Sequence, residues 1–390
     1  MNNIGVDAIS FYVPNYYLDL TELAKGRLID ANKFNIGLGQ YKMSISPPDE
    51  DIVTLGANAA KRLLENIDTN GIDTLLFATE SSIDQSKSAG VYLHQLLNLS
   101  PNCRVVELKQ ACYSSTAALQ MAIGLVQRKP DSKVLIVAAD IARYEFNTPA
   151  EPSQGCGAVA FLVTKHPRIL SIAPEHGLYT QDVMDFWRPN YRSSALVTGK
   201  FSTEMYFHAM IQTWQHYQVA SNLQFTDHDF FCYHTPISRL VEKAHIKLAK
   251  FNDVHLNETQ CYQQMNDALH YSRVIGNSYS AALYISLVSL LDHIIADHSG
   301  ARIGFYSYGA GCVAEYFNGT LQPDYQMKLD TEYHKNLLIA RQAVSFSTYE
   351  EWYSFNTPED GSSFNLPYQN QTGNFRLHGM KNHKRIYKEV

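Results

Sequence analysis

The sequence predicts an α/β protein made of two successive halves, and two observations lead to this prediction. Short apolar runs with strand character alternate with longer segments of helical periodicity, and the alternation continues through both halves of the chain. The chain has 390 residues, 45% of them hydrophobic and 18% charged, so it is too long for one small core and can bury a large interior. We place an N-terminal half over 1–165 and a C-terminal half over 166–390.

The N-terminal half begins with a strand and continues as strand–helix units. Apolar runs predict strands over 5–13, 75–79, 105–108, 134–138 and 158–163. Amphipathic or apolar stretches predict helices over about 51–66, 86–97 and 112–128. This half therefore provides several strand ends at which functional side chains can be placed.

The C-terminal half repeats the pattern without an obvious sequence repeat. Its predicted strands are 168–173, 230–233, 303–308 and 313–317. Its predicted helices cover about 202–219, 236–250, 257–271 and 278–296. The last basic run, 378–388, is interpreted as a solvated end.

Composition argues against several classes of protein. The net charge is −6 and no dense stripe of Lys and Arg occurs, which argues against a nucleic-acid partner. The first residues lack the pattern of a signal peptide and no apolar run reaches about 18 residues, so we expect a cytoplasmic protein without a membrane span. The six cysteines form no C-x-x-C pair and no Cys/His spacing of a zinc site, so neither a disulfide framework nor a metal site is predicted.

One cysteine, Cys112, lies at the junction between a short apolar strand and a long apolar helix. The free N–H groups and the positive dipole end of a helix favour an anion there, so we expect the thiol pKa to be lowered, which makes Cys112 a candidate nucleophile. The alternative is a small buried residue without catalytic function, which is the more common role when position alone is considered.

Glu80 and His234 also follow predicted strands, 75–79 and 230–233. Desolvation beside apolar walls would raise the pKa of Glu80 and make it a proton shuttle near neutral pH. Taken singly, a solvated loop glutamate and a hydrogen-bonded structural histidine are the simpler interpretations. Three such residues at three strand ends favour a common site, because α/β sheets bind ligands beyond the carboxyl ends of their strands.

Several short strings resemble those of 3-hydroxy-3-methylglutaryl-CoA synthase in its compact bacterial form. The resemblance runs from Ile4 to about Tyr316 and is weak after about residue 345. The strings occur in the family's order and are Ala78-Thr79-Glu80-Ser81, Ala111-Cys112-Tyr113, Ala142-Arg143-Tyr144, Asp185-Phe186-Trp187-Arg188-Pro189, His234-Thr235-Pro236, Gly276-Asn277 and Ser307-Tyr308-Gly309-Ala310-Gly311.

This resemblance implies the thiolase-like fold, with two pseudo-equivalent halves in a five-layer α-β-α-β-α arrangement and the site between the halves. It implies condensation of acetyl-CoA with acetoacetyl-CoA through an acetyl-cysteine, as in the mevalonate pathway of isoprenoid biosynthesis. CoA thioesters would be substrates and no metal or redox cofactor would be needed. A homodimer is expected by analogy with thiolase-fold proteins, which usually pair through an edge strand.

The resemblance also assigns roles to further residues. Backbone N–H groups of Ala310 and Cys112 would hold the thioester oxyanion, although 309–311 could equally be a plain turn. Asn277 would hold the keto oxygen of the acceptor beside His234, where a helix N-cap is the default interpretation. The remaining assignments are Tyr144 and Phe186 in the acyl pocket, and Asp140 and Asp185 as supporting acids.

Arg239 and Lys243 lie one turn apart on the predicted helix after His234. This spacing would allow both cations to meet the phosphates of CoA, and a solvated helix face is the alternative. Two positions depart from the family pattern, since Gln110 precedes Ala111 and Ala310 replaces a frequent serine. A backbone oxyanion donor needs neither side chain.

Two rival functions remain open at this point. A polyketide β-branching synthase of the same family uses the same Cys, Glu and His but takes acyl groups from an acyl carrier protein. A non-catalytic thiolase-fold scaffold is the alternative of another class, and the joint presence of Glu80, Cys112, His234 and Asn277 argues against it.

Overall fold

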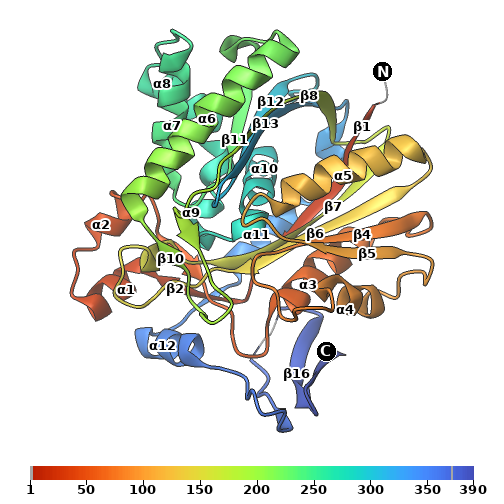
Figure 1. The fold of residues 1–390 in the computed structure, drawn as a ribbon, viewed down its shortest axis with the longest axis vertical. Helices are drawn as coiled ribbons and strands as arrows, with labels where there is room; N and C mark the ends of the chain where they lie inside the picture. Colours follow the sequence, from red (N-terminus) through yellow and green to blue (C-terminus); the bar gives the residue numbers. More distant parts are fainter. Residues whose placement is uncertain (1–2, 370–371) are drawn as a thin grey trace.

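The computed structural model describes residues 3–369 and 372–390 and contains a mixed sheet of nine strands in the order β11-β12-β13-β8-β1-β7-β6-β4-β5 (Figure 1). Residues 1–2 of the predicted N-terminal half and 370–371 of the C-terminal half lie outside this description. The sheet strands are β1 (Ile4–Tyr12), β4 (Ile72–Ala78), β5 (Arg104–Leu108), β6 (Lys133–Ile141), β7 (Cys156–Lys165), β8 (Leu170–Thr180), β11 (Phe230–Tyr233), β12 (Arg302–Gly309) and β13 (Val313–Leu321).

The sheet has two parts that meet at β1 and β8. Strand β1 pairs antiparallel with β7 over most of its length, but with β8 only at Gly5–Ser171 and Val6–Leu170. A Cβ atom on Gly5 would lie 2.0 Å from the carbonyl oxygen of Leu170, so this close crossing requires glycine. Beyond the crossing the two parts run in different directions (Figure 1).

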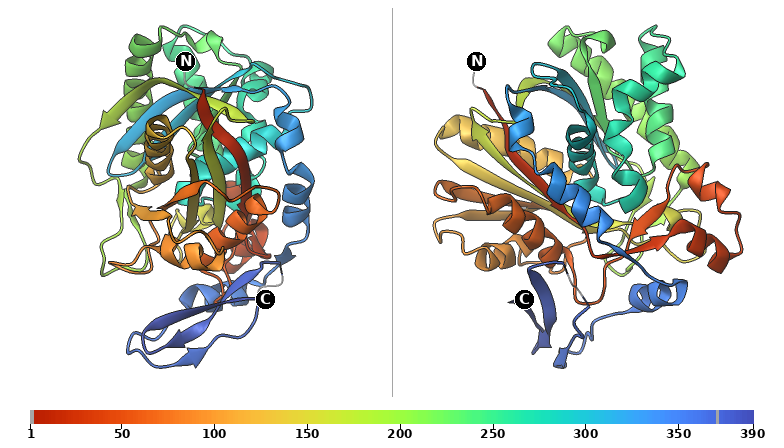
Figure 2. Two further views of the ribbon diagram at one scale, coloured as in Figure 1. Left: turned by 90° about the vertical axis from the view of Figure 1, so that its right-hand side faces the viewer. Right: turned by 180° about the vertical axis from the view of Figure 1, so that it is seen from behind.

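Helices form three layers around the two parts of the sheet. Between them lie α5 (Ser114–Arg128) and α10 (Ala282–His293), where Thr116 Oγ1 is 3.1 Å from the Tyr284 hydroxyl. The outer faces are covered by α3 (Ile52–Leu64), α4 (Ala89–Leu96), α6 (Gly199–Ser221), α7 (Ser238–Phe251) and α8 (Glu258–Met265) (Figure 2). The predicted five-layer α/β fold is therefore confirmed.

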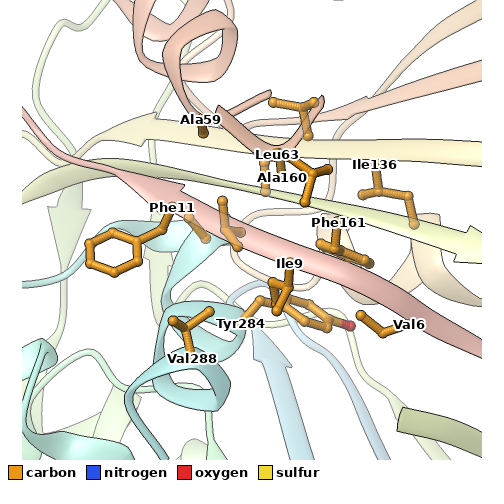
Figure 3. Close-up of a cluster of buried hydrophobic side chains, with 14 of the residues drawn as sticks. Val6, Ile9, Phe11, Ala59, Leu63, Ile136, Ala160, Phe161, Tyr284 and Val288 are labelled. Atoms are coloured by element: carbon orange, nitrogen blue, oxygen red, sulfur yellow. The ribbon is translucent and has the colours of Figure 1, made fainter. Parts of the chain in front are cut away.

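The largest core surrounds β1, which is buried along its whole length. Helix α3 packs on it and begins at Asp51, whose side chain accepts hydrogen bonds from the N–H groups of Val53 (3.0 Å) and Thr54 (3.2 Å). Figure 3 shows the buried side chains that strands β1, β6 and β7 share with α3 and α10: Val6, Ile9, Phe11, Ile136, Ala160, Phe161, Ala59, Leu63, Tyr284 and Val288. Burial on both faces explains why these strands are almost continuously apolar.

The structure differs from the sequence prediction in several places. The predicted helix 257–271 ends at Met265 and is followed by a short 3₁₀ turn and α9 (Ser272–Ile275). A small unit of β2 (Tyr16–Asp19), α1 (Leu20–Arg27), α2 (Asn32–Asn35), β3 (Lys42–Ser44), β14 (Gln342–Ala343) and α12 (Phe346–Ser354) was not predicted, and neither was α11 (Thr331–Ile339), which packs on β1 in the main core.

The interpretation of 378–388 as a solvated end holds only in part, because 381–384 and Lys388 are exposed while the other residues of the run are partly or fully buried. These residues lie in the hairpin of β16 (Phe375–Lys381) and β17 (Lys384–Glu389), which pairs with β15 (Phe364–Asn365). Arg385 forms an ion pair with Asp51 at 3.0 Å, and the Tyr387 hydroxyl donates to the same carboxylate at 2.7 Å. Arg385 therefore pairs with the acidic cap of α3. Within residues 3–369 and 372–390, no helix is both long and apolar enough to span a membrane.

Candidate active site

Cys112 is buried in the turn between β5 and α5, and helix α5 begins only at Ser114. The preceding residue, Ala111, has a φ of +46°, a strained conformation that sets the direction of the turn. Burial, followed by the carboxyl group of Glu80, raises the pKa of the Cys112 thiol well above its ordinary value. The expected lowering of this pKa is therefore wrong, because desolvation and a nearby acid outweigh the start of the helix.

Glu80 follows β4, the parallel neighbour of β5, so both residues lie at the same edge of the sheet. The Cys112 thiol donates to Glu80 Oε1 over 3.1 Å. Burial and the charge of Asp140 raise the pKa of Glu80 to about 8, against the hydrogen bond from Cys112 and the charge of Arg188. The carboxyl group is thus able to exchange a proton near neutral pH.

Asp140, at the end of β6, fixes the backbone around Glu80. Its Oδ1 accepts hydrogen bonds from the Thr79 hydroxyl (2.7 Å) and from the N–H groups of Glu80 and Ser81 (both 2.9 Å). Its Oδ2 accepts from the N–H of Ser280 at 3.0 Å. Asp140 is fully buried, so it connects both halves of the chain beneath the candidate site.

His234 lies at the end of β11, with its N–H donating to the carbonyl of Tyr306 (2.8 Å) and its carbonyl accepting from the Tyr206 hydroxyl (2.8 Å). Burial lowers the pKa of the imidazole to about 3, so the ring is neutral at physiological pH. Within the part of the chain that the structure describes, Nδ1 of His234 has no hydrogen-bond partner. A neutral ring can donate one N–H to a ligand.

Asn277 occupies the loop between α9 and the 3₁₀ turn Tyr279–Ala281. Its side-chain oxygen accepts from the N–H of Tyr279 (2.9 Å), and its own N–H donates to the carbonyl of Ser153 (3.0 Å). The side-chain oxygen thus serves the local turn, and the remaining amide N–H₂ group is the part able to bind a ligand.

Two pockets meet at these residues. A pocket of about 430 Å³ is lined by Cys112, Tyr144, Phe186, His234, Asn277 and Ala310, among others. Glu80 lines a second, larger cleft of about 880 Å³, and Phe186 and Ala310 line both. In the smaller pocket Tyr144 contacts Phe186 edge to face, with ring centroids 6.0 Å apart.

Asp185 holds the loop that contains Ala310. Its Oδ2 accepts from the Tyr308 hydroxyl at 2.5 Å, and its Oδ1 accepts from the N–H of Gly311 at 2.9 Å. The side chain of Gln110 donates to the carbonyl of Ala310 at 3.2 Å, which joins this loop to the turn that contains Cys112. Backbone donors in such a fixed loop can stabilise an oxyanion.

The structure does not bring Arg239 and Lys243 to either pocket. Arg239 forms an ion pair with Glu242 and donates from Nε to the carbonyl of Ile36 (3.3 Å), and Lys243 is exposed on α7. Among the residues described, neither lines the two pockets, whereas their helix neighbour Leu240 does.

Sequence reasoning missed several side chains at the site. Tyr206, Tyr279 and Tyr308 line the smaller pocket, and Arg188 donates to the carbonyl of Glu80. The motif strings contained two of them, Arg188 and Tyr308, without a role. Tyr279 has a φ of +47°, a backbone conformation that no sequence pattern predicts. Across residues 3–369 and 372–390, no group of three or more His, Cys, Asp or Glu could hold a metal ion.

Comparison with known proteins agrees with this geometry. The family model described as hydroxymethylglutaryl-coenzyme A synthase N terminal matches residues 1–167, and the C-terminal model of the same family matches 174–271 and 258–356. The chain is 43% identical to the hydroxymethylglutaryl-CoA synthase of Enterococcus faecalis, over 90% of this chain and 91% of that protein. It is 36% identical to the polyketide biosynthesis 3-hydroxy-3-methylglutaryl-ACP synthase PksG of Bacillus subtilis, over 90% and 88%.

Solved structures give the same result. An HMG-CoA synthase complexed with CoA superimposes with a TM-score of 0.95 at 38% identity, with both chains covered completely. The HMG synthase of the curacin biosynthetic pathway, in complex with holo donor-ACP, gives 0.92 at 31% identity, again with complete coverage of both chains. This chain belongs to the hydroxymethylglutaryl-CoA synthase family.

Proposed function

We propose that this protein condenses acetyl-CoA with acetoacetyl-CoA and water to give 3-hydroxy-3-methylglutaryl-CoA and CoA, with Cys112 as the nucleophile. The supporting observation is the 3.1 Å contact between Cys112 Sγ and Glu80 Oε1, at the wall of the pocket that also holds His234 and Asn277. An acid–nucleophile pair next to polar donors in an apolar pocket suits acyl transfer followed by carbon–carbon bond formation.

In the first step Cys112 attacks the thioester carbon of acetyl-CoA. The negative charge that develops on the oxygen is held by the backbone N–H groups of Cys112 and Ala310, and CoA leaves with a proton. The product is an acetyl group on Cys112. The raised thiol pKa means that the thiol must lose its proton as it attacks.

In the second step the carboxylate of Glu80 removes a methyl proton from the acetyl group. The resulting carbon attacks the ketone of acetoacetyl-CoA, whose oxygen accepts hydrogen bonds from His234 and Asn277. Glu80 then returns its proton to the tertiary alkoxide. Water hydrolyses the remaining thioester and frees Cys112. These steps use CoA thioesters as substrates and require no metal or redox cofactor.

CoA is the proposed acyl carrier, and a carrier protein is the alternative. The higher identity to the Enterococcus faecalis enzyme, 43% against 36% for the ACP synthase PksG, favours CoA. The test is CoA release from acetyl-CoA plus acetoacetyl-CoA, compared with turnover of acetyl groups on a carrier protein. A scaffold would leave Cys112 unacetylated after mixing with acetyl-CoA, which mass spectrometry detects.

A homodimer in the cytoplasm is also proposed. Strand β5 is at the edge of the nine-stranded sheet and directly precedes the Cys112 turn, and its Val106 is 40% exposed. An exposed edge strand is a surface on which a second copy can continue the sheet. Sedimentation equilibrium would test the dimer, and Val106→Lys should shift it toward the monomer.

A further inference from the structure

We propose that α12, in the C-terminal part of the chain, positions Tyr144 and so sets the wall of the acyl pocket, with Tyr353 and Tyr349 as positioning residues. This inference rests on the proposed function. It assigns a role to a helix beyond residue 345, in a stretch that the C-terminal family model covers as far as residue 356.

The segment 142–155 forms one side of the pocket but has little regular structure of its own. Between β6 and β7 it contains only the 3₁₀ turn Glu151–Ser153. Six of its residues line the smaller pocket: Tyr144, Glu145, Thr148, Pro149, Ala150 and Ser153. Because a sheet ladder does not hold this segment, its position depends on side-chain contacts from elsewhere.

Helix α12 contacts the carbonyl of Tyr144 directly and reaches its N–H group through Gln154. The Tyr353 hydroxyl donates directly to the carbonyl of Tyr144. The N–H of Tyr144 donates to Gln154 Oε1 at 2.7 Å, and Gln154 Nε2 donates to the Tyr349 hydroxyl at 2.8 Å. Tyr349 in turn donates to Glu151 Oε1 at 3.0 Å. One turn of α12 therefore restrains Tyr144 from two directions.

An ion-pair network anchors α12 itself. Arg27, at the end of α1, forms ion pairs with Glu151 and with Glu350 of α12, both at 2.7 Å. Its guanidinium also lies between the rings of Phe146 (4.9 Å) and Phe346 (4.7 Å). The side chains of Arg27 and Glu151 are 7% and 2% exposed, whereas Glu350 is 39% exposed, so a largely buried guanidinium joins the pocket segment to a partly exposed carboxylate of α12.

The ring of Tyr144 gives this arrangement a chemical consequence. It packs edge to face against Phe186 and Tyr279 in one buried cluster with Cys112. This is the space that an acetyl group on Cys112 would occupy. A displaced ring would let water reach the thioester, so that hydrolysis to acetate and free thiol competes with condensation.

The test compares Tyr353→Phe with the wild type and with Tyr387→Phe. The control also removes a tyrosine hydroxyl that donates to an acceptor, here Asp51, but at the hairpin away from the pocket. In Tyr353→Phe, loss of the hydrogen bond to Tyr144 should shift the partition of the acetyl-enzyme toward acetate by about two- to tenfold. Tyr387→Phe should keep the wild-type partition.

The same variants are treated with iodoacetamide, and Cys112 alkylation is followed by peptide mass spectrometry. Tyr353→Phe should be alkylated faster, which requires no turnover.

A double-mutant cycle separates positioning from general destabilisation. If Tyr353 acts through the ring of Tyr144, then Tyr353→Phe should have no further effect on partition or alkylation in a Tyr144→Ala background. Additive effects, or an alkylation rate equal to that of the wild type, would overturn the inference. A wild-type protein that fails to condense, while Tyr353→Phe still alkylates faster, would reject the proposed function and keep the positioning role.

Discussion

The Sγ atom of Cys112 lies 3.1 Å from Oε1 of Glu80, and burial raises the pKa of both groups. The resting pair at neutral pH is therefore a thiol next to a carboxyl group that is largely protonated. Only one of the two groups can easily carry a negative charge at a time, because two anions this close repel in a desolvated site. Acetylation of the thiol removes its hydrogen bond to Glu80, so the carboxylate of Glu80, once it has lost its proton, is a stronger base toward the acetyl group.

Cys112→Ala should abolish formation of the acetyl-enzyme and leave the fold intact, since only one sulfur atom is lost. Intact-mass measurement after mixing with acetyl-CoA checks the first part, and circular dichroism checks the second. Cys261→Ala in α8 is the matched control, because it removes another buried thiol away from the pocket. Full turnover by Cys112→Ala would show that Cys112 is not the nucleophile.

Glu80→Gln should still become acetylated but should lose carbon–carbon bond formation by a factor of at least ~10². Acetylation survives because exchange of the thioester onto Cys112 does not need the carboxylate of Glu80. Single-turnover experiments measure the two steps separately. The step assignment for Glu80 fails if the variant blocks acetylation while preformed acetyl-enzyme condenses at the normal rate.

The sequence predicted the strand ends that carry Glu80, Cys112 and His234 because their strands are apolar runs followed by polar residues. It could not predict the acid–base state of Cys112. The thiol pKa depends on how deeply the turn is buried and on a carboxyl group 32 positions away in the chain, and neither is encoded in the local pattern. The positive φ of Ala111 likewise depends on tertiary packing.

The same limit explains the errors in the fold. Strands such as β6 and β7 are buried on both faces and give a strong hydrophobic signal. Helix α12 and the hairpin β16–β17 contain both polar and apolar residues. Ion pairs with distant side chains such as Arg27 and Asp51 help to hold them in place. Such long-range ion pairs leave no periodic pattern, so the tail could not be assigned from sequence alone.

Condensation by the acetyl-enzyme should rise with pH to a midpoint at or above about 8, because the carboxylate form of Glu80 is the base, its pKa is raised to about 8 in the free enzyme, and acetylation removes the thiol hydrogen bond that lowers it. Asp140→Asn should move this midpoint to lower pH, since the charge of Asp140 helps to raise the pKa of Glu80. The matched control is Asp185→Asn, whose carboxylate holds the Ala310 loop instead. It should lower the rate and leave the midpoint in place. An unchanged midpoint in Asp140→Asn would show that Asp140 acts only by holding the backbone.

His234→Ala should weaken acetoacetyl-CoA binding as well as turnover, because the neutral imidazole is placed to donate a hydrogen bond to the acceptor's ketone. Binding is measured in a Cys112→Ala background, where no reaction occurs. The loss should be about tenfold or more, as expected when a donor is removed from a buried acceptor. The pKa of His234 is lowered to about 3, so the imidazole does not titrate between pH 5 and 8. The pH dependence of binding over this range should therefore have the same shape with and without His234→Ala. His228→Gln removes another buried, neutral histidine outside the pocket and should bind normally. Normal condensation by His234→Ala would contradict this role and leave Asn277 as the polarising group.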